Sequence, residues 1–268
     1  MTARRLYLDL FALAADTPLV GDLENRVKMF LESQTSTESL DDAAFALMNG
    51  SDIKADYLLG QRSLIAELKT MNGNPHNRIE QRLKERFAKP GAPIVYGKVG
   101  LSKVIEGMED RDTLNKMLVD LVGRGVRRHL QKANDQIAAI KTRLNLPNAG
   151  GLVILMNDAE PMIDAGAIGY AIDSAFNTVE GGYPHITNVW ASIESHKIRM
   201  PGKRIGYPQL HVYRSLVRLS ELDFMGRLLS AWGEVNGSCL ERLEHHGDWN
   251  AMKPIYERPP PSISPFRR

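Results

Sequence analysis

The chain has 268 residues, with 34 Lys and Arg against 32 Asp and Glu, so its formal net charge is only +2. A hydrophobic share of 43% and a charged share of 25% are typical of a folded globular protein and exclude a wholly disordered chain. The length supports one large domain or two small ones. The near balance of charge excludes nucleic-acid binding through a uniformly basic surface, so any such site must be a local patch.

The single cysteine, Cys239, limits the covalent chemistry of the chain. It cannot form an intramolecular disulfide or a thiolate metal cluster, which favours a reducing, cytoplasmic location. Residues 1–16 carry two arginines and an apolar run that Asp9 interrupts, so we expect a core helix there and not a signal peptide. No run approaches the about 18 apolar residues that cross a bilayer, so we expect no membrane partner.

The first fifty residues are predicted to form helices that pack on a core. Apolar residues recur at helical spacing from Leu6 to Ala14. A second helix is predicted to start at the N-cap Asp22, and its apolar positions share one face: Leu23, Val27, Phe30 and Leu31. A short helix over 40–48 ends at an Asn-Gly pair.

The pattern changes at residue 55, where two short apolar runs flank a Gly-Gln-Arg-Ser segment. Residues 55–59 predict a strand, 60–63 a tight turn and 64–69 a second strand. Strands embedded among helices indicate an α/β or α+β layer fold, of which we expect the α/β class, with its core at 51–200. The further predicted elements are a helix at 78–87, a strand at 94–99, helices at 112–121 and 126–144, a buried strand at 152–156, a helix at 166–176 and a strand at 187–193.

The C-terminal part carries no motif that indicates a function. The pattern from Val212 to Leu243 predicts a helical extension over 201–252. Residues 253–268 contain three consecutive prolines and predict an extended tail. For residues 177–268 three interpretations stay open: a specificity region, a homodimer surface or added helical cover.

The residues that suggest chemistry lie in the predicted hairpin. Glu67 and Lys69 are two apart on one strand and therefore share a face, which Asp56 can reach from the partner strand. Two carboxylates would suit a hard divalent cation, and a neighbouring lysine can orient or help deprotonate a water molecule. Glu67 lies within an apolar strand, where a charge is costly unless it has a purpose. The alternative is a pair of charges facing solvent on an edge strand.

This segment resembles the PD-(D/E)xK nuclease superfamily, whose pattern is an acid on one strand, a tight turn and an acid-x-Lys on the next. Here the pattern reads as Asp56, ten intervening residues and Glu67-Leu68-Lys69, with Ala55 where some members have a proline. The resemblance covers residues 20–160. It implies a restriction-endonuclease-like core, with a mixed central sheet flanked by helices.

The resemblance also implies an activity and a cofactor. Members hydrolyse phosphodiester bonds of nucleic acid, which we expect to be DNA more than RNA. Asp56 and Glu67 would bind Mg²⁺ or Mn²⁺, and Lys69 would position or activate the attacking water. The competing hypothesis is a non-catalytic nucleic-acid-binding or assembly protein on the same fold.

Two outlying positions match further features of the superfamily. Members often carry a glutamate on the helix before the first core strand, which matches Glu24, with Glu32 as a substitute. The alternative is a first-turn glutamate that only favours the helix dipole. Members also carry a Lys/Gln-bearing helix after the third strand. Lys132 and Gln136 are four apart and share a helix face, although an ordinary solvated face would look the same.

Two predicted helices concentrate the positive charge that contacts with phosphate need. Residues 76–89 have five basic residues against two acidic ones, and residues 122–143 have six against one. A soluble surface can show the same charge runs. The candidate nucleic-acid contacts in these helices are Arg78, Arg82, Arg127, Arg128 and Lys132.

Overall fold

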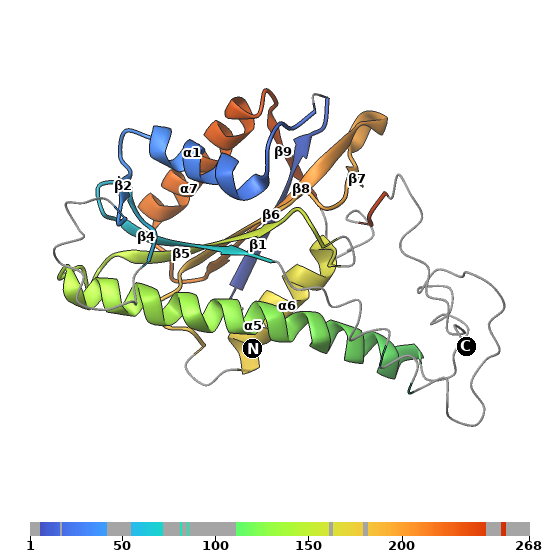
Figure 1. The fold of residues 1–268 in the computed structure, drawn as a ribbon, viewed down its shortest axis with the longest axis horizontal. Coiled ribbons are helices and arrows are strands. Elements are labelled where there is room, and N and C mark those ends of the chain that lie inside the picture. The colour runs from blue at the N-terminus through green and yellow to red at the C-terminus, as the bar shows by residue number, and fades with distance from the viewer. Residues whose placement is uncertain are drawn as a thin grey trace.

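A mixed β-sheet with α-helices on both faces is the architecture of this chain (Figure 1). The computed structural model describes residues 6–16, 18–41, 55–71, 81, 85, 111–160, 163–178, 182–244 and 253–255. The strands are β1 (Leu6–Ala14), β2 (Glu38–Ser39), β3 (Tyr57–Leu59), β4 (Leu64–Thr70), β5 (Gly150–Asn157), β6 (Asn188–Ile193), β7 (Ile198–Arg199), β8 (Ile205–Arg214) and β9 (Leu240–Leu243). The α-helices are α1 (Leu23–Ser33), α5 (Arg111–Arg143), α6 (Ala165–Thr178) and α7 (Leu219–Val235).

The sheet has the order β2-β3-β4-β5-β6-β8-β1-β9, and β7 pairs with β8. The three strands β4, β5 and β6 are parallel to one another, whereas the remaining pairings are antiparallel. Helix α5 connects the parallel neighbours β4 and β5, so it runs back along the sheet, antiparallel to both. The chain is therefore an α/β protein.

The sheet lies between two apolar layers. Helices α1 and α7 cover one face and α5 and α6 cover the other (Figure 1). On the first face Trp232 of α7 makes edge-to-face contacts with Phe30 of α1, at 5.2 Å between ring centroids, and with Trp190 of β6, at 5.7 Å. Every residue of β5 is buried, as expected for a strand between parallel neighbours with helices on both faces.

Several predicted elements are confirmed. The hairpin forms as β3 and β4, joined by the turn at 60–63, and the strands predicted at 152–156 and 187–193 are β5 and β6. Helix α1 is capped by the Asp22 carboxylate, which accepts from the Asn25 amide at 2.9 Å. The predicted apolar face of α1 is the buried one.

The helix predicted from Leu6 to Ala14 is wrong, because this segment is strand β1 between β8 and β9. The spacing of its apolar residues fits the helix period of 3.6 as well as the strand period of two. The side chains that join the core under α5 and α6 sit at even positions, namely Leu6, Leu10, Ala12 and Ala14. A period of two is the strand period, and the pairing with two neighbours decided between the alternatives.

The helical predictions around α5 and α7 need two corrections. The helices predicted at 112–121 and 126–144 are one helix, α5, which passes through Gly123 and Gly125. An interior glycine costs only about 1 kcal/mol, which packing can outweigh. The predicted helical region 212–243 is wrong at both ends, because Val212 belongs to β8 and residues 240–243 form β9.

Strand β8 was not predicted, and it lies inside the sheet between β6 and β1. Pro208 argues against a central strand because it cannot donate a hydrogen bond. The pairing of β8 with β6 covers Gln209 to Tyr213, so Pro208 falls just beyond its end. Strands from the predicted segments 1–50, 51–200 and 201–252 thus share one sheet.

The predictions for 42–48, 94–99, most of 78–87 and most of the tail lie outside the described residues. In the part of the chain that the structure describes, no helix is both long enough and apolar enough to cross a membrane.

Candidate functional site

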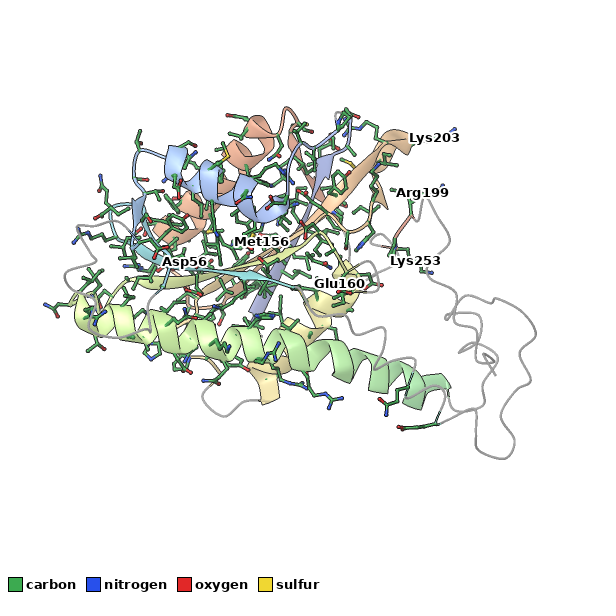
Figure 2. All side chains as sticks on the ribbon, in the orientation of Figure 1. Asp56, Met156, Glu160, Arg199, Lys203 and Lys253 are labelled. Carbon is green, nitrogen blue, oxygen red and sulfur yellow. The ribbon has the colours of Figure 1, made fainter. Side chains whose placement is uncertain are left out.

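Asp56 lies where strand β3 ends its pairing with β4. The Asp56 amide donates to the Ala66 carbonyl oxygen at 3.1 Å, and this backbone hydrogen bond lies at the end of the pairing between β3 and β4. Asp56 Oδ2 then accepts from the Leu68 amide at 2.7 Å. The side chain thereby replaces the next backbone partner of β4, and this fixes the carboxylate in the layer of the sheet, between α1 and α5 (Figure 2).

Glu67 and Lys69 point to the α5 face of the sheet. Lys69 Nζ donates to Glu67 Oε1 and also to Gln136 Oε1 of α5, at 2.8 Å in the second case. Glu67 is only 2% exposed, whereas Lys69 is half-buried. The structure therefore brings together four of the five predicted catalytic residues: Asp56, Glu67, Lys69 and Gln136.

Burial and like charge make the two carboxylates costly to ionise. Burial, followed by the negative charge of Asp56, raises the pKa of Glu67 to about 8, although Lys69 and Gln136 oppose this shift. Burial also raises the pKa of Asp56, against the hydrogen bond from Leu68 and the charge of Lys69. The two acids thus lie close enough for the charge of one to shift the pKa of the other.

Glu67 Oε2 is buried and has no hydrogen-bond partner. Buried polar atoms are normally paired, so an unpaired carboxylate oxygen indicates a missing partner. That partner would have to be a donor or a cation. The negative charge of Asp56 acts on this carboxyl group, and a cation would offset that charge.

Glu24 approaches the site from the opposite face of the sheet. Its Oε2 accepts from the Thr70 hydroxyl at 2.5 Å, and its Oε1 accepts from Lys28 Nζ at 2.6 Å. Hydrogen bonds from Lys28 and Thr70 lower the pKa of Glu24. Thr70 follows Lys69 and points to the other side of β4, so Glu24 reaches the site through Thr70 and not by joining Asp56 and Glu67.

Glu32, the substitute for Glu24, has a different partner. Its Oε1 accepts from the Tyr57 hydroxyl at 3.0 Å. Glu24, Lys28 and Glu32 follow one another at intervals of four, so they form one stripe on α1. The negative charge of Asp56 also raises the pKa of Lys28, after the larger effect of Glu24, which places the Lys28 ammonium near the site.

The described residues fit a magnesium site that takes two ligands from the protein better than a site whose ligands all come from protein side chains. Among the described residues, no three His, Cys, Asp or Glu side chains gather as a ligand set. Mg²⁺ is commonly held by one or two carboxylates, with water and substrate phosphate as its other ligands. Asp56 and Glu67 supply such a pair, and Glu67 Oε2 is free of competing hydrogen bonds.

The predicted basic contacts divide into three groups. Lys132 and Arg128 are exposed on α5, and Lys132 lies one turn from Gln136 on its face. Arg127 is nine residues from Gln136, or two and a half turns, and its charge acts on Tyr183, away from the hairpin. Arg78 and Arg82 lie outside the described residues.

Sequence reasoning missed Thr70, Lys28 and His129. His129 is half-buried on α5 and lies within electrostatic reach of Lys69. The available signals were spacings: Thr70 follows the Glu-x-Lys triplet, Lys28 is four residues after Glu24, and His129 is seven residues before Gln136.

Comparison with known proteins provides no further information about this site. No protein-family model matches the chain, and no curated protein or solved structure shows significant similarity to it.

Proposed function

We propose that the protein is a metal-dependent nuclease that hydrolyses phosphodiester bonds, on a restriction-endonuclease-like core of the PD-(D/E)xK type. The observation that carries the proposal is the cluster on the hairpin. The charge of the half-buried Asp56 acts on the buried Glu67, Lys69 donates a hydrogen bond to Glu67, and the other oxygen of Glu67 has no partner. The order hairpin, helix and parallel strand, formed by β3–β4, α5 and β5, supports the proposed core.

Asp56 and Glu67 would hold Mg²⁺ or Mn²⁺. The bound cation would offset negative charge on the phosphate. Asp56 is held in place by the Leu68 amide, so its carboxylate needs no rearrangement to serve as a ligand. DNA is the expected substrate because the resemblance favours it over RNA.

Lys69 would position the attacking water. Its ammonium donates to Glu67 and Gln136, and a lysine ammonium has three donors, so one donor is left for a water molecule. Gln136 Oε1 lies 2.8 Å from Lys69 Nζ and holds the lysine toward the carboxylates. Glu24 fixes Thr70, the next residue of β4, from the other face.

The test is cleavage of plasmid DNA, single-stranded DNA and RNA with Mg²⁺, with Mn²⁺ and with EDTA. We expect metal-dependent cleavage by the wild type and losses of at least about a hundredfold in Glu67→Ala and Lys69→Ala. Glu38→Ala is the matched control, because Glu38 is an acid of the adjoining strand β2 that pairs with Arg62 at the turn. Equal cleavage by wild type and both site variants would overturn the proposed roles.

One observation favours the competing function, a non-catalytic nucleic-acid-binding or assembly protein. Lys69 already pairs with Glu67, and a local ion pair is also what a purely structural site would contain. Calorimetric titration with Mn²⁺ separates the two. A nuclease binds the ion and loses it in Glu67→Ala, whereas a structural ion pair gives no heat of binding in either protein.

A further inference from the structure

The face of α5 that carries Gln136 continues past the cluster on the hairpin. Because α5 runs antiparallel to β4 and β5, its residues before Gln136 extend toward the carboxyl ends of these strands (Figure 1). His129 is seven residues before Gln136, which is close to two helical turns, so both side chains leave the same face. The carboxyl ends of parallel strands are where α/β sheets commonly bind ligands.

The surroundings of His129 are cationic. Burial lowers its pKa, and the positive charges of Arg128, Lys69 and Lys132 lower it further, in that order. The imidazole is therefore neutral near pH 7 and retains one N–H donor. A neutral donor among three cations attracts an anion and does not compete with the metal for the carboxylates.

His129 is half-buried, so the protein restricts its ring more than it restricts an exposed side chain. Ala133, one turn along the helix, is fully buried, whereas Lys132 is exposed, so His129 lies at the border between the packed face and solvent. A side chain at such a border can contact a ligand while its ring stays held by the protein. Lys132 and Arg128 are exposed, and they can add positive charge beside this donor.

We propose that His129 donates a hydrogen bond to a phosphate of the nucleic-acid strand next to the phosphate at Lys69, while Lys132 supplies charge to the same subsite. The inference rests on the proposed function, because it takes the ligand of the cluster to be a phosphodiester. It adds a specific α5 subsite that orients the strand. The subsite takes a phosphate diester and makes no demand on the base.

The experiment measures equilibrium binding of a short fluorescein-labelled DNA duplex by anisotropy, in EDTA, so that no cleavage occurs. His129→Leu removes the donor at similar volume, whereas His129→Gln keeps an N–H donor. We expect the leucine variant to weaken binding about tenfold, since a hydrogen bond to a charged group is lost, and the glutamine variant to stay within about threefold of wild type. Gln131→Ala is the matched control, because Gln131 is exposed on another face of α5 and bonds Asp135.

Thermal unfolding shows whether each variant is folded before binding is compared. Weaker binding by the leucine variant, with restoration by glutamine, supports the inference. Equal binding by wild type and the leucine variant overturns it, as does a glutamine variant no better than leucine. The proposed nuclease function fails on a separate result, the absence of metal-dependent cleavage by the wild type, so the two failures are distinguishable.

Discussion

Asp56 Oδ2 accepts the backbone hydrogen bond of Leu68 at 2.7 Å, at the point where β3 leaves β4. The Asp56 carboxylate therefore takes the place of a backbone acceptor of the neighbouring strand, and the same carboxylate is one of the two proposed metal ligands. The strand pairing ends where this side chain replaces the backbone partner. It explains why the acid precedes β3 and does not lie within it.

Substitution of Asp56 can separate its hydrogen bond with Leu68 from its proposed binding of the metal ion. Asp56→Asn keeps an oxygen that accepts from Leu68, so we expect the free energy of unfolding to change by less than about 1 kcal/mol. Asp56→Ala leaves the amide without a partner and should lower the free energy of unfolding by about 1–3 kcal/mol. Both variants should lose Mn²⁺ binding. Urea unfolding and calorimetric titration measure the two effects, and retained Mn²⁺ binding in Asp56→Asn would contradict the ligand assignment.

Two buried glutamates, Glu67 of β4 and Glu221 of α7, should respond differently to substitution. Glu67 is 2% exposed, and its pKa of about 8 leaves it mostly protonated near pH 7, so Glu67→Gln exchanges a neutral acid for a neutral amide of the same shape, and the metal-free protein should be about as stable as wild type. Glu221 is 3% exposed, but it accepts hydrogen bonds from Arg218, Thr187 and Asn188. Glu221→Gln should lower the free energy of unfolding by about 2–4 kcal/mol.

Urea unfolding in EDTA compares both variants with wild type. A loss in Glu67→Gln as large as that in Glu221→Gln would mean that Glu67 is structural. The buried, well-paired Glu221 is the reference for what a structural glutamate looks like in this chain.

The hairpin could be predicted from sequence because its information is local. Two short apolar runs on either side of the turn at 60–63 predict the strands, and the strand period of two places Glu67 and Lys69 on one face. The course of β1 could not be predicted in this way. Its spacing fits a helix as well as a strand, and its partner β8 begins nearly two hundred residues later. Only that distant pairing selects the strand.

In the candidate site, too, local relationships could be predicted from sequence, whereas contacts between distant segments could not. Lys69 and Gln136 are 67 positions apart, and the spacing of Lys132 and Gln136 predicted only a helix face, not what that face touches. The position of Glu24 depends on which face of β4 lies under α1, and sequence spacing does not contain that information. Thr70 and His129 were missed for the same reason, since their roles come from neighbours on other elements.

Thr70 provides the test of how Glu24 acts. If Glu24 acts through the Thr70 hydroxyl, Thr70→Val and Glu24→Ala should each reduce cleavage by a similar factor, about three- to tenfold, and leave Mn²⁺ affinity within about threefold. A direct metal ligand would behave differently, because its removal weakens Mn²⁺ binding while Thr70→Val does not. Cleavage rates and Mn²⁺ calorimetry on the two single variants and the double variant decide. Additive losses in the double variant would show that the two residues do not act through one contact.

His211, far from the hairpin along the sheet, should make the protein sensitive to acid. It is 4% exposed on β8, and burial lowers its pKa from 6.5 to about 4. Its Nε2 lies 3.0 Å from Asn188 Oδ1, an acceptor, so the neutral ring carries its proton on Nε2. Protonation of the second nitrogen would place a charge in the core.

Because the folded-state pKa is lower than the unfolded one, this contribution to stability is fully present above about pH 6.5 and is lost as the pH falls toward about 4. The loss for the wild type should be on the order of 3 kcal/mol, at 1.36 kcal/mol for each pKa unit. His211→Gln keeps a donor for Asn188 but does not titrate, so its free energy of unfolding should fall less over the same range by that amount. Urea unfolding at a series of pH values measures both proteins. Equal slopes in this window would show that His211 is not the titrating group, and a steeper slope in the variant would reverse the sign of its contribution.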